Sequence, residues 1–259
     1  MTVAKSKDSE FAVVLDDVKK TFDGKDFVLK GIDLKIPKGK LTSIIGFSGT
    51  GKSVMLKHML GLYKPTSGNI FVLGTDLKTL NEDQLTIFRC NYGVLFQSAA
   101  LFDDMTVLEN VCFPLDEHRR DLKEDQILQI ASEKLKMVGM DSKHNNKLPS
   151  QISGGMQKRT GLARALALDP EILIYDEPTT GLDPILTEMV DNLIVETHQA
   201  RPGTTSIMVS HDLLAAFRIA DFVVMLDAGK VLLAGPPEVF YKTDIELVRR
   251  FVDKGMKHQ

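Results

Sequence analysis

The chain has 259 residues, of which 43% are hydrophobic and 26% are charged, and its formal net charge at pH 7 is −3. A chain of this length can bury a full core, and the composition is ordinary for a globular protein. The small negative charge provides no basic field for nucleic acid, and no apolar run is long enough for a membrane-spanning helix. Residues 1–10 are polar, so we expect a loose tail rather than a secretion signal. Cys90 and Cys112 lack the spacing of a metal site, which favours buried thiols in a reducing, cytosolic compartment.

A β-rich region leads into a glycine-rich loop. We expect strands over residues 11–15, 27–36 and 41–45, separated by Asp/Gly and Pro/Gly turns. The next eight residues, 46–53, fit the phosphate-loop pattern and are followed by helix-forming sequence. Backbone N–H groups, Lys52 and the helix N-terminus attract phosphate, and the Ser53 hydroxyl suits Mg²⁺. The sequence therefore predicts a nucleotide site that contains Gly46, Phe47, Ser48, Gly49, Thr50, Gly51, Lys52, Ser53 and Val54.

Two single residues before and after this loop carry weaker signals. Phe22 stands just before the first turn, where it either stacks on an adenine ring or anchors the loop in the core. Strands expected over residues 69–73 and 88–96 follow the first helix, and the second of these leads directly to Gln97. A glutamine in this place either touches Mg²⁺ and orients water or is an ordinary polar loop residue.

The segment from residue 98 to residue 168 is predicted to be a helical subdomain inserted into a nucleotide-binding core. Thr106 and Glu109 form a capping-box pattern, and apolar residues recur every three or four positions between residues 123 and 138. Ser153, Gly154 and Gly155 then open another helix, and successive glycines at a helix start indicate that something approaches the backbone closely. We expect a second anion site there.

Two adjacent carboxylates end the next strand. Residues 172–175 are apolar, as in a buried parallel strand, and Asp176 and Glu177 follow them. Asp176 is placed to bind Mg²⁺, and Glu177, which faces the other way, to act as base on a hydrolytic water. A helix is expected over residues 185–199. A strand over residues 204–209 then delivers His211 to the edge where open α/β sheets bind ligands.

With these motifs in this order, residues 11–235 resemble the ATP-binding-cassette (ABC) ATPases. The resemblance implies an α/β P-loop NTPase fold with a parallel core sheet, an N-terminal antiparallel β subdomain and an inserted helical subdomain. It implies ATP and Mg²⁺ as cofactors, and a homodimer that holds two ATP molecules head to tail. The roles that it implies are adenine stacking for Phe22, Q-loop functions in catalysis and Mg²⁺ binding for Gln97, the signature motif for residues 152–157, the D-loop aspartate for Asp183 and the switch histidine for His211. Ile152 and Met156 replace the usual leucine and glutamine of the signature.

A narrower resemblance involves residues 96–115 and the Ser-Gly-Gly-Met form of the signature. Both are similar to the ATPases of Mla-type (maintenance of lipid asymmetry) phospholipid transporters, which work with MCE-domain proteins. This implies a location at the cytoplasmic face of a bacterial inner membrane, reached only through partners. The implied partners are a polytopic permease gripped by a groove in the helical subdomain, a periplasmic MCE-domain protein and, as a further candidate, a small STAS-domain protein; nucleic acid is not expected.

Two alternatives to lipid transport stay open. The chain either serves an ABC transporter for another substrate or is a single-cassette ATPase of cell division or iron–sulfur assembly.

Residues 236–259 are expected to form a helical C-terminal extension. Ile245, Val248, Phe251 and Val252 fall on one apolar stripe, which either contacts the other subunit of a dimer or packs against its own domain.

Overall fold

The computed structural model describes residues 10–256, so the predicted N-terminal tail lies outside the described residues except for Glu10. The chain divides into two compact units. Unit 1 contains the residues up to Arg89 and those from Thr205 onward, and unit 2 is Cys90–Thr204. Among the described residues, every helix is too short or too polar to span a bilayer.

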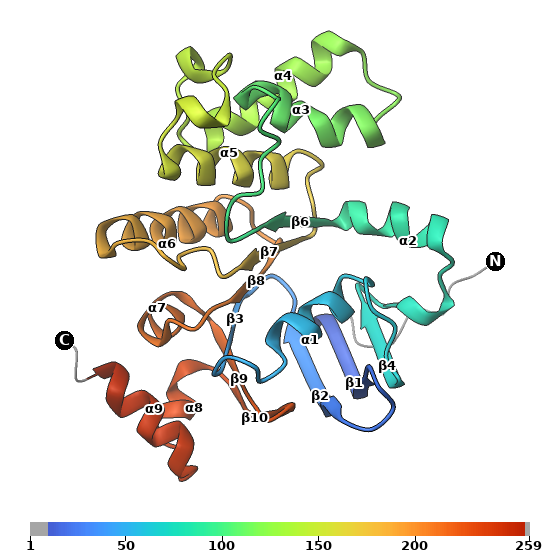
Figure 1. Cartoon of the computed structure of the whole chain (residues 1–259), viewed down its shortest axis with the longest axis vertical. Helices are drawn as coiled ribbons and strands as arrows, with labels where there is room; N and C mark the ends of the chain where they lie inside the picture. The colour runs from blue at the N-terminus through green and yellow to red at the C-terminus, as the bar shows by residue number, and fades with distance from the viewer. Residues whose placement is uncertain (1–9, 257–259) are drawn as a thin grey trace. The chain divides into compact units, whose positions relative to one another are not determined.

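Unit 1 contains an antiparallel sheet in the order β2-β1-β4-β5, of which Figure 1 labels β2, β1 and β4. Its strands are β1 (Phe11–Thr21), β2 (Phe27–Pro37), β4 (Ser67–Val72) and β5 (Thr75–Asp76). The predicted end of the first strand, at residue 15, was too early. Pairing with β2 continues beyond it because the register shifts between Leu15 and Val18, and Asp17 takes up the irregularity in a left-handed conformation with φ of 44°.

The second group of strands in unit 1 runs in the order β10-β9-β3-β8. These strands are β3 (Leu41–Ile45), β8 (Thr205–Val209), β9 (Phe222–Asp227) and β10 (Lys230–Gly235). The central strand β3 pairs in parallel with both β8 and β9, and all of its residues are buried. Parallel strands end at a common edge, so the loops that follow β3 and β8 emerge on the same side of unit 1.

Helices cover unit 1, and those at the C-terminal end pack on one another. They are α1 (Lys52–Met59), α2 (Glu82–Phe88), α7 (Leu213–Ile219), α8 (Pro237–Tyr241) and α9 (Glu246–Met256), with a 3₁₀ turn at Leu77–Thr79. Helix α9 contacts both α7 and α8 (Figure 1). Val248, Phe251 and Val252 are buried by this packing. These three residues of the apolar stripe thus pack against their own chain, whereas a contact of the stripe across a dimer stays a prediction.

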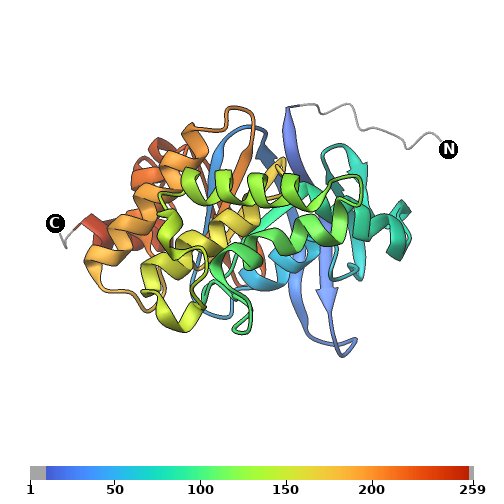
Figure 2. The ribbon, with the colours of Figure 1, turned by 90° about the horizontal axis from the view of Figure 1, so that it is seen from above.

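Unit 2 joins a parallel strand pair to a set of packed helices. The strands are β6 (Tyr92–Leu95) and β7 (Ile172–Asp176), and the helices are α3 (Val107–His118), α4 (Glu124–Met137), α5 (Gly154–Leu166) and α6 (Pro184–Gln199), with 3₁₀ turns at Ser142–His144 and Pro149–Gln151. Helices α3, α4 and α5 contact each other in all three pairs (Figure 2). The predicted capping box at Thr106 and Glu109 is confirmed, since both of its hydrogen bonds are present.

The strand predicted over residues 88–96 is shorter than expected. Phe88 still belongs to α2, residues Arg89–Asn91 form a 3₁₀ turn, and β6 covers only Tyr92–Leu95. The Arg89 guanidinium donates hydrogen bonds to the carbonyl oxygens of Leu60 and Gly61, which anchors the end of α2. The long-range anchor explains the difference, because local strand propensity carries no information about it.

Candidate nucleotide and catalytic site

The phosphate loop of unit 1 connects β3 to α1, and its conformation depends on glycine. Gly46 has a φ of 152°, and a Cβ placed on it would lie 2.4 Å from the carbonyl oxygen of Leu226. Gly51, with φ of 102°, caps the N-terminus of α1 in the left-handed region. Ser48, Gly49 and Ser53 are exposed. The loop therefore presents open backbone and a hydroxyl group at a helix N-terminus, as anion binding requires.

Lys52 folds back onto this loop. Its Nζ donates to the carbonyl oxygens of Gly46, at 2.8 Å, and Phe47, at 2.9 Å, and its side chain is nearly buried. The Phe47 carbonyl also accepts a hydrogen bond from Thr50 Oγ1 at 2.9 Å. Neutral carbonyl acceptors thus hold the Lys52 ammonium next to the loop. A phosphate would give the same ammonium a negatively charged acceptor, which makes a stronger hydrogen bond.

Phe22 is a surface aromatic residue of unit 1. Its side chain is 59% exposed, and its ring meets the ring of Tyr63 edge-on with 5.5 Å between the centroids. The Nζ of Lys20 lies 5.1 Å from the centroid of the Phe22 ring and donates to the carbonyl oxygen of Lys64. The core-anchor alternative for Phe22 is therefore wrong, whereas adenine stacking stays a prediction.

His211 also belongs to unit 1 and is exposed at the end of β8. The neighbouring Asp212 caps α7 by accepting a hydrogen bond from the Ala215 N–H, and its own N–H donates to Ser210 Oγ. These bonds fix the backbone on the C-terminal side of His211. Because β8 pairs in parallel with β3, His211 and the phosphate loop lie at the same strand edge.

In unit 2, Asp176 and Glu177 follow the four buried residues of β7. Glu177 has a φ of 47°, a left-handed conformation that is strained for a residue with a side chain. Its carboxylate accepts a hydrogen bond from Thr180 Oγ1 at 3.0 Å, and its carbonyl oxygen accepts one from the Thr180 N–H. Such strain persists where the surroundings hold it and is frequent at functional sites.

Gln97 follows β6 and is exposed, and its backbone carbonyl is held by a residue that the sequence reasoning missed. Lys158 of α5 donates from Nζ to the carbonyl oxygen of Gln97 and, at 2.8 Å, to that of Pro178. Burial lowers the pKa of this ammonium group. The sequence does indicate that Lys158 is buried. It lies four and eight positions before Leu162 and Leu166, so it shares their buried helix face.

The signature residues begin α5. Ser153 is the N-cap of the helix, where its Oγ accepts a hydrogen bond from the Met156 N–H. Gly154 and Gly155 differ in how much space a side chain would find at each position. A Cβ on Gly155 would lie 2.6 Å from the Met189 Cε, whereas a Cβ on Gly154 would meet nothing within 4 Å. The Met189 methyl is the end of a flexible side chain, so a Cβ on Gly155 would require only that this side chain shift, and the exposed backbone of Gly154 is open to another molecule.

Asp183 has a structural role within unit 2. Its carboxylate accepts hydrogen bonds from the N–H groups of Ile185 and Leu186, both at 3.0 Å, so it is the N-cap of α6. A second role of Asp183 in a dimer stays a prediction.

The donor set suits Mg²⁺ bound together with phosphate. No group of three or more His, Cys, Asp or Glu side chains that could hold a metal occurs within residues 10–256. Mg²⁺ usually takes only one or two protein ligands and fills its other positions with water and phosphate oxygens. The exposed Ser53 hydroxyl beside the phosphate loop fits that pattern.

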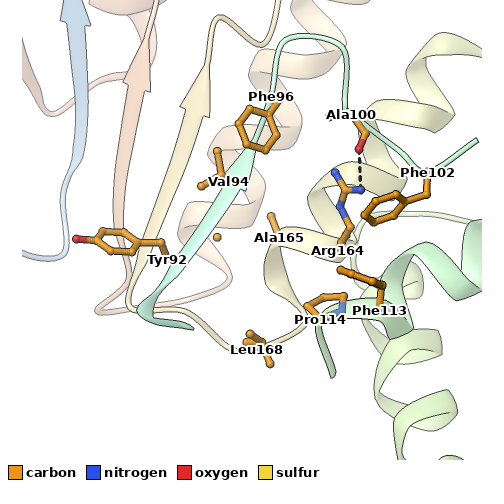
Figure 3. A pocket seen from close by; sticks show the side chains of 11 residues that line it. Tyr92, Val94, Phe96, Ala100, Phe102, Phe113, Pro114, Arg164, Ala165 and Leu168 are labelled. Atoms are coloured by element: carbon orange, nitrogen blue, oxygen red, sulfur yellow. Dashed lines mark hydrogen bonds between the residues drawn. The ribbon is translucent and has the colours of Figure 1, made fainter. Parts of the chain in front are cut away.

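A groove in unit 2 lies beside the loop that follows Gln97. It has a volume of about 320 Å³, and its lining includes Phe96, Phe102, Phe113, Pro114 and Leu168 (Figure 3). Arg164 of α5 points into this region. Its guanidinium donates to the carbonyl oxygens of Ala99 and Ala100, both at 2.8 Å, and lies 5.6 Å from the centroid of the Phe102 ring (Figure 3). The loop that forms one wall of the groove is thus held in place from α5.

Known proteins resemble the chain over most of its length. The family model described as ABC transporter matches residues 29–180. The probable ribonucleotide transport ATP-binding protein mkl of Mycobacterium leprae is 40% identical over 242 residues, which cover 93% of this chain and 69% of that protein. The intermembrane phospholipid transport system ATP-binding protein MlaF of Haemophilus influenzae is 39% identical over 227 residues, which cover 87% of this chain and 85% of that protein.

Among solved structures, the dimeric post-hydrolysis structure of the ATP-binding cassette MJ0796, bound to ADP and Pi, has a TM-score of 0.77 at 35% identity. The match covers 87% of this chain and 98% of that chain. The predicted α/β P-loop fold is thereby confirmed.

Proposed function

Because the chain belongs to the ABC transporter family of ATP-binding cassettes and is therefore an ATP-hydrolysing subunit, we propose that it drives phospholipid movement between bacterial inner and outer membranes. One observation carries the lipid assignment. The likeness to MlaF extends over nearly the full length of both chains, at 39% identity. The name of mkl refers instead to ribonucleotide transport, so the substrate class is what the experiment must decide.

In the proposed cycle, two copies of the chain bind two ATP molecules head to tail. The phosphate loop of one copy holds the phosphates, and Phe22 stacks on the adenine. Ser153 and Gly154 of the other copy cap the γ-phosphate. The open space around Gly154 supports this assignment, since the fold of its own unit leaves that backbone accessible.

Hydrolysis is assigned to groups at the ends of the parallel strands. Mg²⁺ neutralises charge on the phosphates when bound, and Ser53, Gln97 and Asp176 are the residues that we propose to hold it, directly or through water. Glu177 polarises the attacking water, and His211 contacts the γ-phosphate.

The groove beside the Gln97 loop is the proposed docking site for a membrane permease. Its lining is largely apolar and aromatic, and Arg164 anchors the loop that forms its wall. A permease seated there would touch a loop whose first residue, Gln97, belongs to the catalytic set. Through such partners the chain would work at the cytoplasmic face of the inner membrane, in a complex with an MCE-domain protein and, as a further candidate, a STAS-domain protein.

The test is native mass spectrometry of the complex purified through this chain from detergent-solubilised membranes of its own host. We expect a polytopic permease, an MCE-domain protein and bound phospholipid. A permease without phospholipid or MCE protein would replace the lipid assignment with another substrate. A dimer with no membrane protein would contradict transport altogether.

Two matched variants test the docking site within the same experiment. Leu168→Glu places a charge in the groove, so we expect it to release the permease while ATP binding persists. Ile87→Glu makes the same kind of change at a residue of unit 1 that is 73% exposed, and it should leave the complex intact. Equal permease retention in both variants would argue against the groove.

A further inference from the structure

Lys158 connects two functional loops of unit 2. Its ammonium donates to the carbonyl oxygen of Gln97, which follows β6, and to that of Pro178, which follows Glu177. Only 5% of the Lys158 surface is exposed. One buried side chain therefore touches the backbone of the loop proposed to sense the permease and the backbone next to the proposed base.

Burial of an ammonium group destabilises the folded state, so its presence in a core calls for a role that an apolar side chain could not fill. Transfer of an amine cation from water is costly, and the two partners of Lys158 are neutral carbonyls that only partly replace its hydration. An apolar side chain of similar length would fill the same space without that cost. It could not, however, hold two carbonyl oxygens at one point, because only a donor with several N–H groups does so.

The backbone at Glu177 is held from two sides. Thr180 contacts both the carboxylate and the carbonyl oxygen of Glu177, and Lys158 holds the carbonyl oxygen of Pro178. Glu177 itself is in a left-handed conformation, which needs such support. Removing the contact of Lys158 would leave this segment free to relax toward a less strained backbone.

The Gln97 loop is held by the same helix. Lys158 holds the carbonyl oxygen of Gln97, and six residues further along α5, Arg164 holds those of Ala99 and Ala100. Helix α5 begins at Ser153, the signature residue. The helix that would cap the γ-phosphate of the partner copy thus sets the positions of both loops in its own unit.

We propose that Lys158 is a positioning residue for ATP hydrolysis. Through the Gln97 and Pro178 carbonyls, it holds the Gln97 amide and the Glu177 carboxylate in the positions that hydrolysis requires. It touches neither nucleotide nor water in this role. The inference rests on ATP hydrolysis alone and is independent of the substrate transported.

The test compares variants of the full-length chain in three measurements: kcat for ATP, affinity for ADP, and ATP-induced dimerisation in a Glu177→Gln background. Lys158→Met keeps the length and removes every donor. We expect its kcat to fall roughly tenfold to a hundredfold. ADP affinity and dimerisation should stay within about twofold of the parent, because the phosphate loop is in unit 1 and Ser153 is unchanged.

Two further variants separate positioning from helix packing. Lys158→Gln restores two N–H donors on a shorter chain and should recover part of the lost kcat. Thr160→Val removes a buried hydroxyl that donates to the Met156 carbonyl within α5, and it should keep parental kcat.

Several results would overturn the proposal. One is parental kcat in Lys158→Met. Another is an equal fall in Thr160→Val, because general disturbance of α5 would then be sufficient. Equal kcat in the Met and Gln variants would exclude a role for the donors. Lost dimerisation in Lys158→Met would place the defect at the signature instead. If Lys158→Met does not fold, Lys158→Gln is compared with Thr160→Val. A kcat of Lys158→Gln below that of Thr160→Val supports the proposal, and equal kcat in these two variants overturns it.

Discussion

The ring of Phe251 lies edge-on against the ring of Phe47, with 4.7 Å between the centroids and 82° between the planes. Phe47 belongs to the phosphate loop and is half exposed, whereas Phe251 belongs to α9 and is 9% exposed. The Phe47 carbonyl is one of the two that hold the ammonium group of Lys52. The last helix of the chain thus packs directly on the loop proposed to bind nucleotide.

Truncation of Phe251 should affect both stability and binding. For Phe251→Ala we expect the free energy of unfolding to fall by about 3 kcal/mol, because a buried aromatic ring is lost. ADP affinity should also weaken by about threefold to tenfold, the range typical of one aromatic pair. Denaturant titration and calorimetry of ADP binding provide the two values.

Arg249→Ala is the matched control on the same helix. Arg249 is exposed and pairs with Asp244, so its loss should change the free energy of unfolding by less than about 1 kcal/mol. ADP affinity at the parental level in Phe251→Ala would show that the ring contact does not support the loop.

Replacing Phe22 should selectively weaken the binding of adenine nucleotides. Stacking of a base on an aromatic ring contributes about 1–3 kcal/mol, so Phe22→Ala should raise the ATP dissociation constant roughly fivefold to a hundredfold. Phe22→Tyr keeps the ring and should bind normally. Phe27→Ala removes another exposed aromatic residue that follows the same turn and serves as the control. Unchanged affinity in Phe22→Ala would leave this residue without a role in the site.

Glu177→Gln should separate ATP binding from hydrolysis. The amide cannot accept a proton from water, so we expect kcat to fall by about 10²–10⁴ while ATP still binds. With ATP trapped, the closed dimer should accumulate and be visible by size-exclusion chromatography. Turnover at the parental rate in this variant would remove Glu177 from its assigned role.

Cys112 should make stability decrease at high pH. It is a buried free thiol in α3, and burial raises its pKa to about 11, with the charges of Asp116 and Glu109 acting in the same direction. The folded state therefore keeps the proton that the unfolded thiol releases near pH 8.5. Its stabilising effect is complete below that pH and is lost as the pH rises toward about 11.

Thermal unfolding between pH 8 and pH 10.5 measures this effect. The decrease should be smaller in Cys112→Ala than in the parent chain. In the folded protein, the Cys112 thiol should also resist alkylation by iodoacetamide at pH 8. Identical pH profiles for parent and variant would contradict the assignment.

The sequence by itself predicted the features that depend on consecutive residues. Eight adjacent residues define the phosphate loop, the capping box needs only Thr106 and Glu109, and β7 can be identified from four apolar residues followed by two carboxylates. In each case the determining interactions are local, either with the backbone within one turn or with the period of a strand. The order of these motifs along the chain was then sufficient to indicate the family.

Tertiary structure decided the features that depend on residues far apart in sequence. The contact between Phe47 and Phe251 joins positions 204 residues apart, and Lys158 reaches carbonyls 61 residues before it and 20 residues after it. Neither is encoded in local propensity, because a phenylalanine or lysine on a helix can pack or point to solvent depending on what the chain brings beside it. Burial against distant backbone makes Lys158 a connection between two loops that we propose to act in catalysis, rather than a surface charge.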